Sequence, residues 1–182
     1  MYMGLQILIG LIYTNFVEWF IHKNILHGLG KNKKSIWSFH WKNHHKNVRK
    51  YKGLDPVYIK GIRNFNAHTK ELVALVLGVS VHIPVLFYFP AFFWTLVFSA
   101  ILYYILHRKS HNNVVWARYF LTWHYDHHMG KNQDVNWCVT WPLFDWIMGT
   151  RVKYAFTNEE YIDLHHMRTL GKLLKKSKRL RK

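Results

Sequence analysis

The chain has 182 residues and a formal net charge of +17, from 26 Lys and Arg against nine Asp and Glu. All the basic residues lie in two blocks, 22–71 and 107–182, while residues 1–17 and 72–106 contain no charged side chain. Two long uncharged runs exclude an ordinary nucleic-acid-binding domain and predict a membrane protein, in which Lys and Arg gather in the cytoplasmic segments.

The first predicted membrane span covers residues 4–21. Its 18 residues would rise about 27 Å as a helix, which is just enough to cross the hydrocarbon core of a bilayer. The start of the chain lacks the basic stretch and the small-residue cleavage site of a signal peptide, so we expect this span to be retained.

The second apolar region, residues 72–106, is too long for one span. Its 35 residues would make a helix about twice as long as the hydrocarbon core requires, so the chain must fold back. The stretch "YFPAF" at 88–92 is the predicted turn, which gives spans near 72–88 and 91–106. Pro84 is expected to kink the second span rather than to end it.

Three spans place the end of the first span and the end of the third on the same side of the membrane. Both ends are followed by basic segments, 22–71 and 107–171, which the positive-inside rule assigns to the cytoplasm. The basic tail 172–182 is either a solvated end or a segment that touches anionic headgroups. The sequence therefore predicts one all-α domain over residues 1–182, an integral membrane protein with about three transmembrane helices and a cytosolic helical cap.

Ten of the fourteen histidines fall in four short clusters, which this topology brings to the cytoplasmic face. The clusters are "HKNILH" at 22–27, "HWKNHH" at 40–45, "HRKSH" at 107–111 and "HYDHH" at 124–128. Neutral imidazole is the commonest protein ligand for first-row transition metals. Ten histidines exceed what one ion can bind and predict a dinuclear metal site, with four or five imidazoles for each ion. Cys138 is the only cysteine, so neither an intrachain disulfide nor a thiolate metal cluster is expected.

Helix geometry indicates which of these rings can converge. Positions four apart on an α-helix differ by about 40° around the axis, so His40 and His44 should share a face. His45 is turned away by about 100° and is free to serve a second metal. His22 and His27 are five apart, so they must bracket the site, or the helix must end between them. The last two clusters have spacings of three and four, which place their histidines on one helix face each.

Two carboxylates are predicted partners of the ligands. Glu18 lies four residues before His22, on the same helix face, and a hydrogen bond between them would fix the tautomer and the orientation of the ring. The alternative for this residue is a carboxylate that reaches water at the end of the span. Asp126, inside "HYDHH", is either a second partner of this kind or an acid on the surface of a helix.

The four other histidines are not expected to bind metal. His82 lies in the middle of a predicted span, where packing or a hydrogen bond to another span is the expected role. His68 is expected at the membrane interface, and His165 and His166 are expected to be solvated because they adjoin the basic tail.

The clusters resemble the histidine boxes of the membrane fatty acid hydroxylase and sterol desaturase superfamily of di-iron oxygenases. "FVEWFIHKNILH" is similar to the first box, "FHWKNHH" to the second, "LYYILHRKSH" to the box at the end of a span, and "HYDHH" to the terminal box. "PLFDWIMGTR" is similar to the closing segment of the family. The resemblance covers residues 18–151. It departs from the family pattern in two ways: three residues instead of two precede the histidine pair of the second box, and about three spans replace the usual four.

The resemblance implies a cofactor, a reaction and partners. It implies two iron ions, with zinc as a substitute in isolated protein, held by His22, His27, His40, His44, His45, His107, His111, His124, His127 and His128. Either all ten bind directly, or one of them only supports the others. It also implies molecular oxygen as co-substrate, a lipid substrate such as a fatty acyl chain or a sterol, and electrons from a separate reductase, cytochrome or ferredoxin. Hydroxylation is the first expectation, and desaturation begins with the same hydrogen abstraction.

Two other functions stay open. A carotenoid hydroxylase-like enzyme has boxes that also resemble "HKNILHG", although "FDWIMGTR" favours the fatty acid and sterol branch. A membrane protein that binds or moves metal without catalysis is the alternative from a different class. A transporter is expected to place its ligands inside the spans near the midplane of the bilayer, whereas these clusters lie at the ends of the spans.

Overall fold

The computed structural model describes residues 2–60, 62 and 65–166 of the chain, and the regular elements within them are all helices. The basic tail at 172–182 lies outside the described residues. Helix α1 (Met3–Phe20) continues without a break into a wider π-helical turn, η1 (Ile21–Leu29), and together they form one long rod. This rod and α6 (Pro90–Asn112) are the two described helices that are long and apolar enough to cross a membrane.

The second predicted span is broken into two helices. Helix α4 (Ala67–Ser80) is followed by a turn and by the short α5 (Ile83–Leu86). Pro84 has no N–H group to donate to the carbonyl of Ser80, so it ends the longer helix instead of kinking it. With 14 residues, α4 is about 21 Å long, and it falls short of the length of a span. The fold-back at 88–92 is confirmed, because α6 begins at Pro90 and packs against α5.

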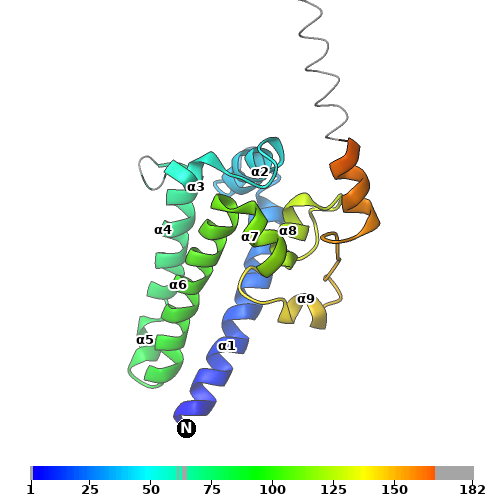
Figure 1. Ribbon diagram of the computed structural model, residues 1–182. Coiled ribbons are helices and arrows are strands. Elements are labelled where there is room, and N and C mark those ends of the chain that lie inside the picture. Colours follow the sequence, from blue (N-terminus) through cyan, green and yellow to red (C-terminus); the bar gives the residue numbers. More distant parts are fainter. Residues whose placement is uncertain (1, 61, 63–64, 167–182) are drawn as a thin grey trace, which may run out of the picture.

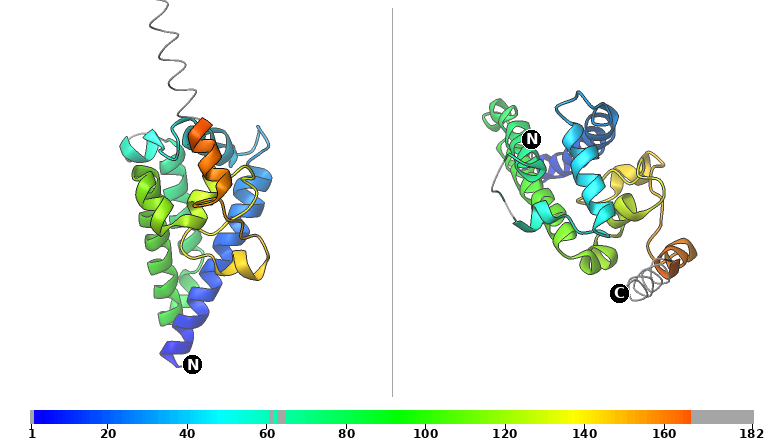
Figure 2. Two further views of the ribbon diagram at one scale, coloured as in Figure 1. Left: turned by 45° about the vertical axis from the view of Figure 1, so that its right-hand side comes forward. Right: turned by 90° about the horizontal axis from the view of Figure 1, so that it is seen from above.

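The long helices stand side by side and carry most of the remaining elements at one end. Figures 1 and 2 show α4, α6 and α1 next to one another, with the N-terminus and α5 at the end away from most of the other short helices. The short helices are η2 (His40–His45), α2 (Lys46–Lys50), α3 (Pro56–Lys60), α7 (Val114–Phe120), α8 (Thr122–Met129) and α9 (Leu143–Ile147). Residues 158–166 are also helical. All four histidine clusters therefore come from the rod ends or from the short helices above them.

A buried polar network fixes the loop between α8 and α9 against α1. The Asp145 carboxylate is 0% exposed and accepts hydrogen bonds from the backbone N–H groups of Trp137 (2.8 Å) and Cys138 (2.9 Å). The Trp19 ring packs on the same two residues. Because these groups are satisfied inside the protein, the loop is held in one position beside the first histidine cluster.

Candidate metal centre

The ten clustered histidines lie together, although they come from four separate segments. Nine of them form two groups, in each of which the ligand atoms all lie within 4.8 Å of one another: His22, His27, His40, His45 and His127 in the first group, and His44, His107, His111 and His128 in the second. His124 lies beside the second group, with its Nε2 atom 3.1 Å from the Nε2 atom of His111. Each of the ten residues is at most 4% exposed, so the rings are shielded from bulk water.

The two π-helical turns explain the spacing of five residues in the first two clusters. In a π-helix the hydrogen bond joins positions five apart, so residues i and i+5 lie on the same face. Both His22 and His27 thereby reach the first group without a break in the helix, and the expectation that the helix ends between them is wrong. His40 and His45 are also five apart within η2, and their Nε2 atoms are 3.2 Å apart.

The same geometry corrects the predicted pairing in the second cluster. His45 joins His40 in the first group, while His44 points to the second group with the histidines of α6. Three residues separate His40 from the histidine pair, where the family pattern has two, and the wider π-helical turn accommodates the extra residue. Helix α8 is divided in the same way, because His127 belongs to the first group and its neighbour His128 to the second. The prediction that the histidines of α8 share one face is therefore wrong for His127.

Backbone carbonyls hold three of the rings in a defined tautomer. The Nδ1–H group of His22 donates to the carbonyl oxygen of Trp137 (2.5 Å), and that of His127 donates to the carbonyl oxygen of Val135 (2.6 Å). The Nδ1–H group of His111 donates to the carbonyl oxygen of Gly53 (3.2 Å). A carbonyl oxygen can only accept a hydrogen bond, so Nδ1 carries the proton in each ring. The Nε2 lone pair is then left to point into the group, as a metal ligand requires.

Three carboxylates hold three further rings in the same way. The Nδ1–H group of His27 donates to Asp134 (3.1 Å), and that of His44 donates to Asp55 (2.9 Å). The Nδ1–H group of His107 donates to Glu71 (2.6 Å). None of these acids was predicted from the sequence as a partner. Asp55 does carry a signal, because it is the only acid between residues 19 and 70, in a segment otherwise rich in Lys and Arg.

The two acids that were predicted as partners bind other groups. Glu18 accepts hydrogen bonds from the backbone N–H groups of Val139 and Thr140 and from the Thr140 hydroxyl. It therefore fixes the loop whose Trp137 carbonyl binds His22, and the predicted direct bond between Glu18 and His22 is replaced by this indirect support.

Asp126 does not contact a histidine nitrogen among the described residues through any hydrogen bond. It forms an ion pair with Arg151 (2.7 Å) and accepts a hydrogen bond from the backbone of Ala155 (2.6 Å). These contacts join α8 to the segment that follows α9, so Asp126 helps to fix the position of α8.

The arrangement of the rings fits bound metal ions. His107 and His111 both donate through Nδ1, so the two Nε2 lone pairs face each other at 3.2 Å without a proton between them. The Nε2 atoms of His44 and His128 are buried and have no hydrogen-bond partner among the described residues. Buried lone pairs in this arrangement are costly unless a cation lies among them. The donor set, all imidazole, suits Fe, Zn, Cu or Ni.

Burial also keeps the rings neutral. Loss of hydration lowers the pKa of His44 from 6.5 to about 3, even though Asp55 acts in the opposite direction. Desolvation likewise lowers the pKa of His45, His127 and His128 well below the ordinary value. At neutral pH these side chains are therefore in the form that binds metal.

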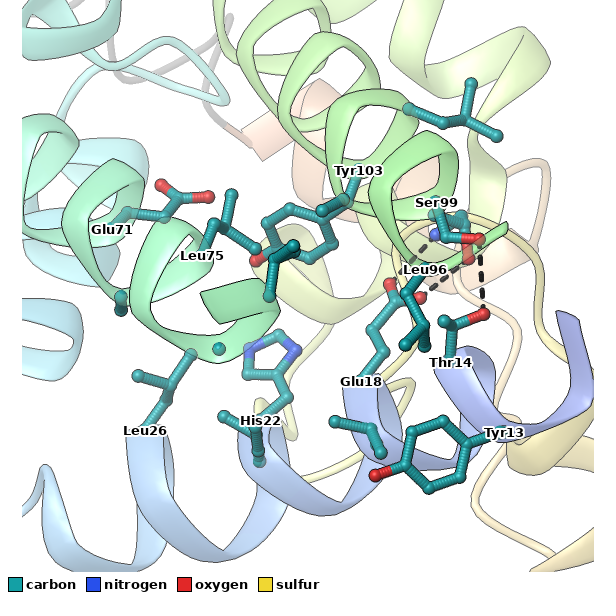
Figure 3. Close-up of a pocket in the computed structure, with 18 of the residues that line it drawn as sticks. Tyr13, Thr14, Glu18, His22, Leu26, Glu71, Leu75, Leu96, Ser99 and Tyr103 are labelled. Carbon is teal, nitrogen blue, oxygen red and sulfur yellow. Dashed lines mark hydrogen bonds between the residues drawn. The ribbon is translucent and has the colours of Figure 1, made fainter. Parts of the chain in front are cut away.

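An apolar cavity of about 360 Å³ lies between α1, α4 and α6 and reaches the first group of histidines. His22 and His40 are among its lining residues, and most of its lining surface is apolar. Figure 3 shows one wall formed by the rod of α1 and η1, from Leu26 and His22 in η1 to Glu18 and Tyr13 in α1. Its volume is within the range of small-ligand sites, about 300–1,000 Å³, and its lining suits a hydrocarbon chain.

The remaining histidines lie away from the two groups. His82 accepts a hydrogen bond from the Tyr13 hydroxyl (2.9 Å), which confirms the predicted bond to another long helix. His68 is 0% exposed and stacks on the Tyr104 ring, so its predicted interfacial position is wrong. The reason is that Asn66 begins α4 as its cap and places His68 in the first turn, against α6. His165 and His166 are exposed, as predicted.

Comparison with known proteins identifies the family. A search of the curated proteins and a search of the solved structures give no match. A family model described as fatty acid hydroxylase matches residues 7–150, which include all ten clustered histidines and most of the cavity wall. The chain therefore belongs to the fatty acid hydroxylase family.

Proposed function

We propose that this protein is a di-iron, O2-dependent oxidoreductase that hydroxylates a lipid in the membrane, with desaturation as the related outcome. The observation that carries the proposal is the opening of an apolar cavity onto His22 and His40, which belong to a buried group of five imidazoles. A protein that only stores or moves metal has no use for a hydrocarbon-lined cavity at its ligands.

The first group would hold one iron ion, and the second group together with His124 would hold the other. When bound, the two ions would supply the activation of dioxygen and the removal of hydrogen from an unactivated C–H bond. The carboxylates of Asp55, Asp134 and Glu71 keep their imidazoles in the tautomer that offers Nε2. Zinc could replace iron in isolated protein, because imidazole suits both metals.

The chain itself binds and positions the substrate. The apolar wall of the cavity excludes water from the carbon that is to react, and it fixes which part of a fatty acyl chain or sterol lies beside His22. Exposed apolar side chains on the outer faces of α1 and α6, such as Leu8 and Phe98, are in keeping with lipid around these helices. The substrate would therefore enter from the bilayer.

The proposed orientation places the metal centre on the cytoplasmic face, with the α4–α5 pair as a third, shorter inserted segment. The segment 22–60 carries ten Lys and Arg and a single acid, Asp55, which is buried. The positive-inside rule assigns such a segment to the cytoplasm. A separate reductase, cytochrome or ferredoxin would then deliver electrons at this face.

A comparison of the wild-type chain with His128→Ala tests the function. Cells that express the wild-type chain under isotopically labelled dioxygen should accumulate lipids that gain one labelled oxygen atom or lose two hydrogens. The His128→Ala variant should insert in the membrane at the wild-type level and lose this product by at least about a hundredfold, because a direct ligand is lost. Equal product from the variant, or purified wild-type protein without bound transition metal, would refute the proposal. A product confined to a carotenoid would favour the carotenoid hydroxylase alternative.

A further inference from the structure

The cavity has a polar end far from the metal ligands. Along the rod of α1 and η1, its lining runs from Leu11 to Leu26 and includes His22 and, nine residues earlier, Tyr13. At about 1.5 Å per residue, this separation is about 13 Å along the helix axis. Val17, Leu75 and Leu96 line the space between them.

The hydrogen bonds of this end define which chemistry it can recognise. The Nδ1–H group of His82 donates to the backbone carbonyl of Gly78 (2.7 Å), so the Nε2 atom of His82 is an acceptor. The Tyr13 hydroxyl must then donate its only proton to this Nε2 atom, at 2.9 Å. The phenolic oxygen of Tyr13 keeps acceptor capacity, so the pair offers the cavity an acceptor and no donor.

Helix packing alone gives no reason for this polar pair. The α1 helix is already held against α6, where Gly10 lies close to Thr95 and the Thr14 hydroxyl contacts the Ser99 hydroxyl. The Tyr13–His82 bond instead crosses from α1 to the turn between α4 and α5. Polar groups in an apolar, lipid-facing region are costly and generally mark a functional site.

We infer that Tyr13 is a specificity-determining residue that accepts a hydrogen bond from a hydroxyl group of the substrate. The inference rests on the proposed function and narrows its substrate class to lipids that carry a hydroxyl, or a similar donor, about 13 Å from the carbon beside the metals. The hydroxyl is seated at the Tyr13 end, and the hydrocarbon body reaches His22 through the apolar part of the cavity.

Regiochemistry tests the inference with straight-chain alcohols. Purified protein that contains two iron ions, supplied with a reductant, is given decanol and dodecanol. The wild-type protein should oxidise both at the same number of carbons from the hydroxyl. Tyr13→Phe should raise the KM for the alcohols about three- to tenfold, the loss expected for one neutral hydrogen bond, and should spread the positions of attack. Iron content and kcat should stay within about twofold of wild type.

The matched control is Tyr88→Phe, because Tyr88 is 77% exposed and does not line the cavity. This variant should keep the wild-type KM and the wild-type position of attack. A second variant reverses the preference: in His82→Leu the Tyr13 hydroxyl is free to donate, so methyl octyl ketone should gain affinity relative to decanol.

Binding measurements separate this inference from the proposed function. Decanol should raise the melting temperature of the wild-type protein more than decane does, and Tyr13→Phe should remove the difference. If the wild-type protein shows this difference but no turnover, the recognition site stands and the proposed oxidation fails. Attack counted from the methyl end overturns the inference, as does a melting temperature that responds equally to decanol and decane.

Discussion

At the scale of single residues, the histidines that gather at the candidate metal centre were predictable and their hydrogen-bond partners were not. The ten histidines were found because their spacing within each cluster is local and can be read along the chain. Two of the three carboxylate partners come from distant segments: Asp134 lies 107 residues after His27, and Glu71 lies 36 residues before His107. Only the fold brings these pairs together. Nearness along the chain therefore predicted Glu18 and Asp126 as partners instead.

Asp55 gives the sharpest test at this scale. It is 0% exposed, and it accepts hydrogen bonds from His44, Asn47 and Val57. Asp55→Asn should keep part of this network but remove the charge that favours the Nδ1–H tautomer of His44. The affinity for the second metal ion should fall about 10–100-fold, which isothermal titration of metal-free protein would measure. Asp163→Asn, at an acid that accepts a hydrogen bond from Tyr154 and contacts neither group, is the control. Unchanged affinity would mean that Asp55 does not support His44.

At the scale of elements, the sequence predicted where helices lie better than how they wind. The apolar runs predicted the long helices, and "YFPAF" predicted the start of α6 at Pro90. The π-helical turns were missed because an α-helix was assumed for both clusters. A π-helix aligns positions five apart, so it places His40 with His45. The assumed α-helix placed His40 with His44, which gave the wrong grouping. The break after Ser80 was also missed, because proline inside a span was expected only to kink it.

The loop between α8 and α9 provides an element-scale prediction. Asp145→Ala would leave the backbone N–H groups of Trp137 and Cys138 buried without an acceptor. The free energy of unfolding should fall by about 2–4 kcal/mol, since each unsatisfied buried donor costs about 1–3 kcal/mol. The first metal ion should also bind less tightly, because the Trp137 carbonyl orients His22. Thermal unfolding in detergent measures the stability, and its dependence on added metal measures the affinity, with Glu159→Ala as the control at a partly exposed acid that pairs with Lys131. A variant as stable as the control would contradict this account of the loop.

At the scale of the whole molecule, the topology argument was correct about the gathering of the clusters. The two predicted spans between the first and third clusters return the chain to the side that it left, which predicted that these clusters meet on one side, and the structure brings all four into contact. What the sequence could not give was the shape of the cavity, because its wall combines side chains from α1, α4, α6 and the loop at 140–141. Such a volume depends on the distances between helices, which are set by packing.

The pH dependence of stability belongs to this scale because it sums over the buried rings. Burial sets the pKa of His44 at about 3 in the folded chain, against an ordinary value of 6.5, and the pKa values of His45, His127 and His128 are also lowered. As the pH falls below 6.5, the unfolded chain takes up protons that the folded chain does not, so the folded state loses stability. Metal-free protein should have a constant melting temperature above about pH 7 and a falling one between about pH 6.5 and 5. A melting temperature that stays constant between about pH 6.5 and 5 would contradict neutral buried histidines.

The division of neighbouring histidines between the two groups has a mechanical consequence. Along η2 and again along α8, consecutive side chains point to different groups of imidazoles, at His44 and His45 and at His127 and His128. Helices η2 and α8 thus each connect the two groups of histidines, and neither group can shift without the other. Metal binding to one group should order the other group in advance, so that binding is cooperative. Protein with only one ion bound should therefore be short-lived.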